Sequence, residues 1–418
     1  MHLLTDMKSL DPLLKDIDER RIVMLGEASH GTHEYYTWRT AISKRLIQEK
    51  GFRFIAVEGD WPDCYRINRY VKGYEDAGAD ISSILQTFDR WPTWMWANWE
   101  VAALADWLKE YNRKLPLERR VGFYGLDVYS LWDSMSTIMH YLEKEDQQTA
   151  ASVKKAIACF EPFNEDEHLY ARSSLADHNC RDEVLNMLRE VRLKAQFLDG
   201  DMEAGFNTEQ NALIAVNAER YYRSMIGFSN ESWNIRDGHM METLERLLEF
   251  HGILSKGIIW EHNTHIGDAR ATDMTGAGMV NIGQLAREEY GKEHVYLAGF
   301  ASYKGTVIAG SEWGAPMQKM VVPEARAESI EAVLHDEYGT NCYKLFSDKR
   351  EEVFATRIGH RAIGVVYHPG AERRGNYVPS VLPERYDALI FLDETQALHP
   401  LHMKPHDQKM PETYPFGI

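Results

Sequence analysis

Five ionisable residues are concentrated in the stretch VMLGEASHGTHEYYTWR, residues 23–39, where they directly follow an apolar run. They are Glu27, His30, His33, Glu34 and Arg39. An imidazole has a pKa near 6.5, so it exchanges a proton with water at neutral pH, and a nearby carboxylate can orient it. These residue types predict acid–base chemistry at the junction between a buried strand and a helix.

Three other apolar runs also end in acidic or imidazole side chains. These side chains are Glu58, Asp60, Asp127, Glu261, His262 and His265. In an open parallel sheet, the loops at the carboxyl ends of the strands form the ligand crevice. If the strands are neighbours, the sequence predicts a cluster of three or four imidazoles and two or more carboxylates.

Two chemistries fit such a cluster. In the first, a histidine is a general base that takes a proton from water, and a carboxylate fixes its tautomer. In the second, the side chains bind a divalent metal that lowers the pKa of a bound water to about 7. The spacing His262-x-x-His265 at a strand end differs from the helical H-E-x-x-H pattern. We therefore expect no cofactor; a metal would need ligands from separate loops, namely His30, Glu58, His262 and His265.

Several common catalytic motifs are missing from the sequence. No G-x-S-x-G elbow is present, and Ser29 lacks the flanking glycines of a nucleophilic serine. No P-loop or G-x-G-x-x-G follows a strand, so nothing supports ATP or NAD binding. The four cysteines, at positions 64, 159, 180 and 342, are scattered without a C-x-x-C pair. This pattern predicts neither a zinc knuckle nor a disulfide framework, and it indicates a reducing compartment.

The elements that must position these side chains are short runs that are apolar on both faces, as in central parallel strands. The runs are residues 21–26, 52–59, 121–127, 257–263, 294–300, 361–368 and 386–393. Between the first two, helical spacing predicts a helix with Thr32 as its N-cap and Gly51 at its end. The predicted fold class is α/β, with a mostly parallel sheet core, flanking helices, a helical insertion and a small C-terminal α+β part.

The pattern of the sequence changes twice along the chain. Between residues 134 and 254 the β-rich runs give way to long amphipathic, charged segments, which predict the helical insertion. Residues 1–133 and 255–314 are expected to form a discontinuous α/β catalytic core. Residues 315–418 are expected to form the α+β part that completes this core.

The composition restricts the partners of the protein. With 47 Lys and Arg residues against 64 Asp and Glu residues, the net charge is −17, which argues against nucleic acid and against an anionic membrane surface. The N-terminal segment lacks an apolar signal stretch, and no run of about 18 apolar residues predicts a transmembrane helix. We expect a cytoplasmic protein that acts on a small molecule.

Other residues are candidates for binding a substrate. They are Trp61, Asp127, Arg236 and Asp237. The last two lie near the end of the helical insertion and have helix capping as an alternative role. For Arg39, binding of a substrate carbonyl or carboxylate and pairing with a buried Glu58 are equally weighted. Five of the eleven tryptophans lie between residues 91 and 107; packing in the core or at an interface is the first interpretation and a broad apolar cleft the second.

Four segments carry a family resemblance. In this order they are LGEASHGTHEYYTWR, FIAVEGDWPD, WNIRDGHM and WEHNTHIGDAR, and together they resemble the erythromycin esterase family over most of the chain. The ordered set is more specific than any one segment. The resemblance implies hydrolysis of a macrolide lactone ester by an activated water, without a covalent enzyme intermediate. Some proteins of this kind are labelled succinoglycan biosynthesis, so the resemblance leaves the natural substrate open.

The residues that match the family's motif are His30, Glu27, Glu58, Arg39, His262 and His265. By this resemblance, His30 is the general base and Glu27 is the carboxylate beside it. The hypothesis is an ester or lactone hydrolase in which the other four residues position the base or substrate, stabilise the oxyanion or protonate the leaving alcohol. A metal-dependent hydrolase with the same side chains and a non-catalytic protein that binds a metal or a glycan are the alternatives.

Overall fold

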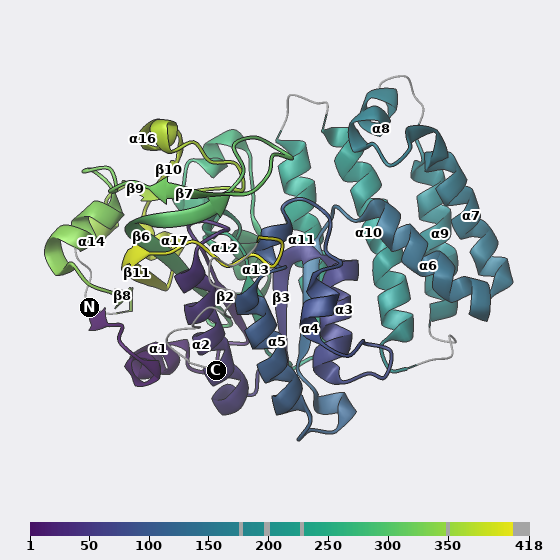
Figure 1. The fold of residues 1–418 in the computed structure, drawn as a ribbon, viewed down its shortest axis with the longest axis horizontal. Coiled ribbons are helices and arrows are strands. Elements are labelled where there is room, and N and C mark those ends of the chain that lie inside the picture. Colours follow the sequence, from purple (N-terminus) through teal and green to yellow (C-terminus); the bar gives the residue numbers. More distant parts are fainter. Residues whose placement is uncertain (175–178, 196–200, 226–229, 348–351, 404–418) are drawn as a thin grey trace. The chain divides into compact units, whose positions relative to one another are not determined.

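Figure 1 shows the computed structural model, an α/β protein built on a mixed, mostly parallel sheet, which confirms the predicted fold class. The structure describes residues 1–174, 179–195, 201–225, 230–347 and 352–403. Contacts divide the chain into two units. The first comprises Met1–Glu58, Arg66–Tyr124 and Leu254–Ile418, and the second comprises Gly59–Tyr65 and Gly125–Ile253. The domain boundaries expected after residues 133, 254 and 314 stay a prediction.

The described residues form one large sheet in the order β1-β8-β11-β6-β2-β5-β3-β4, with β7 paired to β6. Its strands are β1 (His2–Leu3), β2 (Ile22–Leu25), β3 (Phe54–Asp60), β4 (Gly122–Asp127), β5 (Gly257–Trp260), β6 (Val295–Ala309), β7 (Gln318–Val322), β8 (Cys342–Leu345) and β11 (Ala388–Thr395). The pairs along β11, β6, β2, β5 and β3 are parallel. A smaller antiparallel sheet pairs β9 (Ile358–Arg361) with β10 (Tyr377–Ser380).

The register of three parallel strands decides where the polar loops meet. Every residue of β2 and β5 is buried, which is why these runs are apolar on both faces. Leu25 lies opposite Trp260, and Trp260 lies opposite Val57. Because these three residues share one level, the residues that follow them leave the sheet at the same edge.

The prediction of a strand at residues 361–368 is wrong. The strand there is β9, which ends at Arg361, and Ile363 beyond it makes only an isolated bridge to Ser29. The backbone N–H of Ile363 donates to the carbonyl of Ala28 at 2.8 Å. This segment therefore lies across the loops at the sheet edge, and its apolar character reflects the burial of Ile363 and Tyr367 rather than a continuous ladder.

Most of the remaining elements are helices outside the helical insertion. They are α1 (Asp11–Ile17), α2 (His33–Lys50), α3 (Trp61–Lys72), α4 (Ile81–Leu85), α5 (Trp99–Asn112), α12 (Asn263–Ile266), α13 (Ile282–Tyr290), α14 (Ile330–Tyr338), α15 (Glu352–Ala355), α16 (Glu372–Gly375) and α17 (Leu382–Arg385). The predicted ends of α2 are confirmed: Thr32 occupies the N-cap position, and Gly51 follows the helix with φ 71°. The Thr32 hydroxyl is bonded to the Ser29 hydroxyl rather than to the helix.

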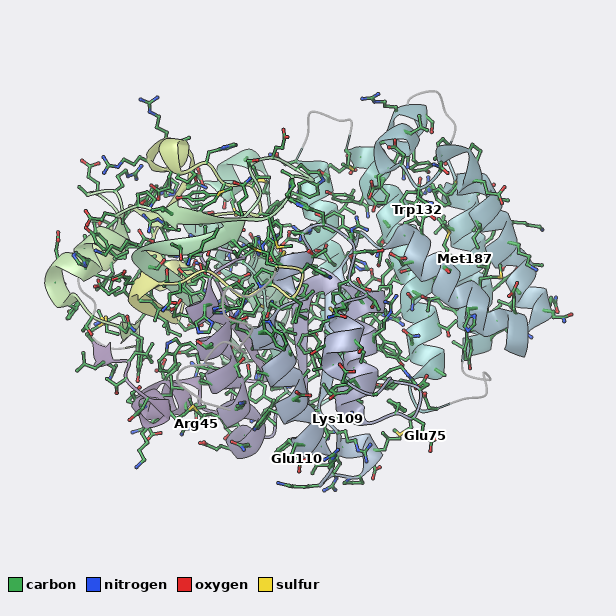
Figure 2. All side chains as sticks on the ribbon, in the orientation of Figure 1. Arg45, Glu75, Lys109, Glu110, Trp132 and Met187 are labelled. Atoms are coloured by element: carbon green, nitrogen blue, oxygen red, sulfur yellow. A yellow bond between two sulfur atoms is a disulfide. The ribbon has the colours of Figure 1, made fainter. Side chains whose placement is uncertain are left out.

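The second unit is built from helices that pack against one another. They are α6 (Leu131–Glu145), α7 (Gln147–Phe160), α8 (Glu167–Ser174), α9 (Arg181–Ala195), α10 (Ala204–Ser224) and α11 (Glu231–Phe250). Figure 1 shows α6, α7, α9 and α10 side by side, and these helices share one apolar core. Figure 2 labels Met187, which is fully buried in that core, and Trp132, which packs against it. The described residues between 134 and 254 contain no strand, as the amphipathic pattern predicted.

The scattered cysteines indicated no disulfide framework, and the structure corrects this for one pair. Cys159 at the end of α7 and Cys180 just before α9 form a disulfide, with their Cα atoms 5.8 Å apart. The packing of α7 against α9 brings together two residues whose spacing in sequence gives no such signal. Cys64 and Cys342 are free and buried. The cytoplasmic location stays a prediction; among the described helices, none is both long and apolar enough to cross a membrane.

Candidate active site

Glu27 holds two basic side chains in place in the loop between β2 and α2. Its Oε1 accepts a hydrogen bond from Nδ1 of His30 at 2.9 Å, and its Oε2 accepts one from Nη2 of Arg39 at 2.6 Å. The side chains of Glu27 and Arg39 are 1% and 0% exposed, and that of His30 is 9% exposed. Because Nδ1 of His30 donates its proton to a carboxylate, the lone pair of the neutral ring is at Nε2. The geometry therefore fixes His30 in the tautomer that a general base needs.

The alternative pairing of Arg39 with Glu58 is wrong, since the carboxylate that Arg39 contacts is Glu27. The guanidinium also lies over the rings of Tyr36 and Trp260, 4.5 and 4.7 Å from their centroids. Arg39 is on the second turn of α2, and this turn faces the loop that precedes the helix. A fully buried guanidinium held in this way stabilises the charge of Glu27, and this placement gives no support to direct contact with a substrate.

Glu58, at the end of β3, holds the loop that follows β5. Its Oε2 accepts a hydrogen bond from the backbone N–H of His262 at 2.9 Å, and its Oε1 lies 3.4 Å from Nε2 of His265. The Glu58 carbonyl in turn accepts a hydrogen bond from Nε1 of Trp96 at 2.8 Å. The sequence suggested core packing for the tryptophan cluster, and this specific support of Glu58 by Trp96 was not predicted.

His262 occupies the N-cap position of α12, and its bonds define its tautomer. Its Nδ1 accepts the backbone N–H of Thr264 at 3.3 Å and is bonded to the Thr264 hydroxyl at 2.8 Å. The ring proton is therefore at Nε2. Burial and the neighbouring His30 ring lower the pKa of His262 well below its usual range, against the opposing charge of Glu58. The His30 and His262 ring centroids are 4.9 Å apart, so the neutral ring of His262 lies beside the imidazole of His30.

A hydrogen-bond chain fixes the residue next to His262. The side chain of Asn263 bonds both backbone groups of Phe300 in β6, donating to the carbonyl at 2.7 Å and accepting from the N–H at 3.1 Å. Its amide nitrogen also reaches Nε2 of His360 at 3.2 Å, and Nδ1 of His360 bonds Glu331 at 2.7 Å. These contacts hold the start of α12 rigidly against the sheet. Nothing in the sequence pattern pointed to His360 or Glu331.

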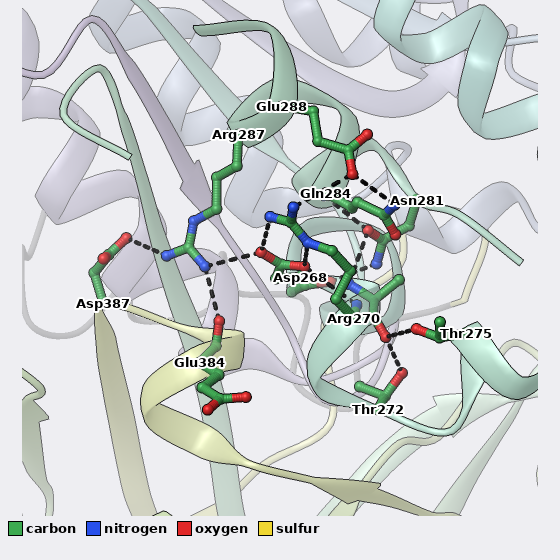
Figure 3. A network of polar contacts seen from close by, with 12 residues as sticks. Asp268, Arg270, Thr272, Thr275, Asn281, Gln284, Arg287, Glu288, Glu384 and Asp387 are labelled. Carbon is green, nitrogen blue, oxygen red and sulfur yellow. Dashed lines mark hydrogen bonds and ion pairs between the residues drawn. The ribbon is translucent and has the colours of Figure 1, made fainter. Parts of the chain in front are cut away.

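The segment after His265 is anchored by ion pairs, shown in Figure 3. Arg270 makes two hydrogen bonds to the Asp268 carboxylate, at 2.9 and 2.8 Å. Arg287 forms ion pairs with both Asp268 and Asp387, and Asp387 directly precedes β11. Asn281 donates to the Thr264 carbonyl at 2.7 Å. Burial favours the protonated form of Asp268. The hydrogen bond from Arg270 and the charges of Arg287 and Arg270 outweigh burial and lower the pKa of the Asp268 carboxyl. The loop that carries the paired histidines is therefore held at both ends.

Two glycines of the motif are required by close backbone approaches. A Cβ atom on Gly26 would overlap the side-chain oxygen of Asn263, and one on Gly31 would overlap the backbone carbonyl of Ile308. The stretch between these glycines contains Glu27 and His30. The glycines therefore allow the loop to lie tightly against α12 and β6, and this packing orients Glu27 and His30.

His33, the second histidine of the motif, belongs to a separate cluster. Its Nδ1 bonds Oε1 of Glu100 at 2.5 Å, and Nδ1 of His399 bonds the same oxygen at 2.7 Å. Burial opposes a charge on His33, but the bond to Glu100 and the charges of Glu100 and Glu34 raise its pKa. The sequence gave no signal for Glu100 or His399, because both lie far from His33 along the chain.

The candidate substrate-binding residues lie in the second unit. Arg236 makes two bonds to Asp127, at 2.9 and 2.6 Å, and lies over the Tyr129 ring. Arg236 and Asp237 are inside α11, whose N-cap is Asn230, so the capping alternative is wrong.

Trp61 and Asp237 are both fully buried. Trp61 donates from Nε1 to the side chain of Asn207 at 2.8 Å and stacks on Tyr65. This placement gives Trp61 a packing role within the unit. Substrate binding by Trp61, Asp127, Arg236 and Asp237 stays a prediction.

The mostly parallel sheet with a buried carboxylate–imidazole pair at its strand ends defines an α/β protein with a candidate acid–base centre. A comparison with protein families identifies this class more closely. The chain belongs to the family described as erythromycin esterase, whose model matches residues 47–395. This match confirms the resemblance read from the motifs, although it begins after the loop that contains Glu27 and His30.

Two relatives cover most of the chain. Erythromycin esterase type II of Escherichia coli is 22% identical over an alignment of 369 residues, and the match covers 82% of this chain and 84% of that protein. The putative hydrolase YbfO of Bacillus subtilis strain 168 is 20% identical over an alignment of 406 residues, and the match covers 92% of this chain and 86% of that protein. The family and these names indicate a hydrolase.

Solved structures show that the fold is shared. A succinoglycan biosynthesis protein has a TM-score of 0.78 at 18% identity and covers 95% of each chain. An erythromycin esterase mutant, EreC, in its open conformation has a TM-score of 0.67 at 17% identity, with 94% of this chain and 95% of that chain covered. At these identities the comparison supports the fold and leaves the substrate open.

Proposed function

We propose that the protein hydrolyses a carboxylic ester or lactone by direct attack of a water molecule that His30 activates. The observation that carries the proposal is the pair of bonds on Glu27, which orient His30 and leave its Nε2 as a base. His30 keeps more exposed surface than Glu27, 9% against 1%. The imidazole therefore keeps a small solvent-accessible surface while the carboxylate is shielded.

The reaction follows from these positions. Nε2 of His30 takes a proton as the water oxygen bonds to the acyl carbon, and the carbonyl oxygen becomes an oxyanion. The neutral N–H at Nε2 of His262 is a suitable hydrogen-bond donor to that oxygen. When the tetrahedral species collapses, the bond to the alcohol oxygen breaks and that oxygen receives the proton from His30. One water is consumed, and the products are an alcohol and a carboxylic acid.

The supporting residues hold the base in its working state. Arg39 compensates the charge of Glu27, so the carboxylate can stabilise the imidazolium that forms. Glu58 positions both histidines of the loop after β5. The hydroxyl of Ser29, beside His30, is bonded to the Thr32 hydroxyl and is nearly fully buried. A serine held in this way lacks the imidazole partner of a nucleophile, which supports water as the attacking group.

The test is mass spectrometry of macrolides and simpler esters incubated with the protein, with His30→Ala as the blank. His335→Ala is the matched control, because His335 also bonds a carboxylate, that of Asp393, at 2.6 Å. We expect a product that is heavier by one water with wild type and His335→Ala, and no acyl adduct on the intact protein. Turnover of simple esters alone would remove macrolides as the substrate class.

Two results would contradict the mechanism. One is near-wild-type turnover by His30→Ala, and the other is accumulation of an acyl-enzyme. A metal-dependent mechanism at the same side chains predicts a third pattern: a chelator abolishes turnover in wild type and in His399→Ala alike, and added metal restores it. Protein without a histidine tag is needed for this comparison.

A further inference from the structure

Three side chains from distant parts of the chain converge on one point beside the proposed catalytic loop. His33 comes from the first turn of α2, Glu100 from the first turn of α5, and His399 from the segment after β11. One nitrogen or oxygen from each lies within 4.8 Å of the other two. Both imidazoles direct Nδ1 at the same oxygen of Glu100.

Backbone hydrogen bonds hold these three segments together independently of the side chains. The N–H of His33 donates to the carbonyl of Gln396 at 2.9 Å, and the N–H of Trp99 donates to the carbonyl of His399 at 3.1 Å. The ligand atoms are therefore positioned by the fold rather than by long flexible side chains. Such preorganisation is what a metal site built from separate loops requires.

The bonding of Glu100 is incomplete. Its Oε2 is buried and makes no hydrogen bond, and the side chain is 1% exposed. A buried carboxylate oxygen without a partner is unusual, because burial of such an oxygen removes it from water without replacement. The cluster thus presents a carboxylate with one oxygen still able to accept a ligand bond.

We propose that His33, Glu100 and His399 bind a divalent transition-metal ion of the Zn²⁺ type, at a site distinct from the His30 cluster. Two imidazoles and a carboxylate are a donor set that suits Zn²⁺ and disfavours Mg²⁺ or Ca²⁺. Tetrahedral zinc needs ligand atoms about 3.3 Å apart at its usual bond lengths. The Nδ1 atoms of His33 and His399 now lie 2.5 and 2.7 Å from Glu100 Oε1. To admit the ion, each imidazole gives up its hydrogen bond to Glu100 and moves away from Oε1 by about 0.6–0.8 Å.

The proposed site has a structural consequence. An ion bound there joins the first turn of α2, the first turn of α5 and the segment after β11. His33 is three residues beyond His30 in the chain, so the ion fixes the helix end that follows the base without contacting it. The proposal is independent of the proposed hydrolysis, since it concerns binding alone.

The experiment is a titration of tag-free, chelator-treated full-length protein with Zn²⁺ by calorimetry, and with Co²⁺ by visible absorption. We expect one equivalent to bind, with Co²⁺ bands typical of four-coordinate nitrogen and oxygen ligands. His399→Ala should weaken Zn²⁺ binding at least about 100-fold, because it removes one of three ligands. Glu100→Gln should have the same effect, and circular dichroism establishes that each variant is folded.

Two control variants separate this site from other histidines. His335→Ala should bind Zn²⁺ like wild type, since His335 forms a two-residue pair with Asp393. His30→Ala should also bind like wild type while losing hydrolysis, which distinguishes failure of this proposal from failure of the proposed function. The proposal is overturned if wild type binds no Zn²⁺, or if His399→Ala retains binding that His30→Ala loses.

Discussion

Two carboxylates, Glu27 and Glu100, each hold a histidine from the same short motif, and their other partners differ. Glu27 bonds His30 and the permanent cation Arg39. Glu100 bonds His33 and a second imidazole, His399. In the first cluster the arginine supplies the compensating charge, and a single imidazole shares the carboxylate with it. In the second cluster the compensating charge must come from the imidazoles, and the pKa of His33 is raised.

A histidine–glutamate pair does not define a general base by itself. The third partner of the carboxylate decides whether one imidazole stands alone on it or shares it with a second imidazole. For this reason His30 and His33, three residues apart, are assigned different roles. Variants that exchange or remove the third partner test this distinction.

The largest expected effect separates the two histidines directly. His30→Ala should lower kcat/KM about 10²–10⁴-fold, because it removes the proposed general base. His33→Ala should leave the base in place and reduce activity by roughly tenfold at most, through looser packing of the start of α2. Steady-state kinetics on any ester that wild type hydrolyses checks the difference. Equal losses of activity in the two variants would contradict different roles for His30 and His33.

Removal of Arg39 should affect stability most. Arg39→Met leaves the buried Glu27 carboxylate without its cation, and breaking a buried pair costs about 3–5 kcal/mol. Urea denaturation measures the free energy of unfolding. Arg39→Lys should retain part of that stability, because it keeps a cation but loses the planar guanidinium that lies over the rings of Tyr36 and Trp260. A loss below about 1 kcal/mol in Arg39→Met would mean that Glu27 is compensated in another way.

The two carboxylates can be compared with one substitution at each. Glu27→Gln removes the group that stabilises the imidazolium, so activity should fall on the order of 10²-fold while the shape of the site is kept. Glu100→Gln should change activity much less and abolish the proposed metal binding. Kinetics and a Zn²⁺ titration on the same two samples give both readouts. Loss of activity in Glu100→Gln alone would reverse the assigned roles.

The neutral state of His262 gives a prediction for pH. Its pKa is well below the usual value in the folded state, whereas in the unfolded chain it is about 6.5. Below about pH 6.5 the unfolded state binds a proton that the folded state does not, so acid favours unfolding. Wild type should lose more stability than His262→Gln between about pH 7.5 and 5.5. If the free energy of unfolding changed with pH equally in the two proteins, His262 would be protonated in the folded state as it is in the unfolded chain.

The smallest effect is expected at the edge of the second cluster. The His399 side chain is 37% exposed, so His399→Ala should reduce stability by about 0–1 kcal/mol in the absence of metal. Activity should stay within roughly twofold of wild type, since no proposed catalytic residue is touched. Thermal unfolding with and without Zn²⁺ checks this. Stabilisation by Zn²⁺ in wild type that persists in the variant would place the ion elsewhere.

The sequence by itself determined the features that depend on local pattern. The apolar runs indicated most of the strands, and Thr32 and Gly51 marked the ends of α2, because burial and capping act on neighbouring residues. The polar residues after three strands indicated where the site lies. Glu27 and His30 are close in the chain, so their bond required only the loop that the motif's glycines allow.

Only the tertiary structure decided the contacts between distant segments. The order β2-β5-β3 placed Glu58 beside His262, Arg39 turned out to face Glu27, and packing joined Cys159 to Cys180. The cluster of Glu100 and His399 joins residues 299 apart in the chain. No local periodicity encodes such pairs, because they follow from how whole elements pack, and that packing is set by the burial of many residues together.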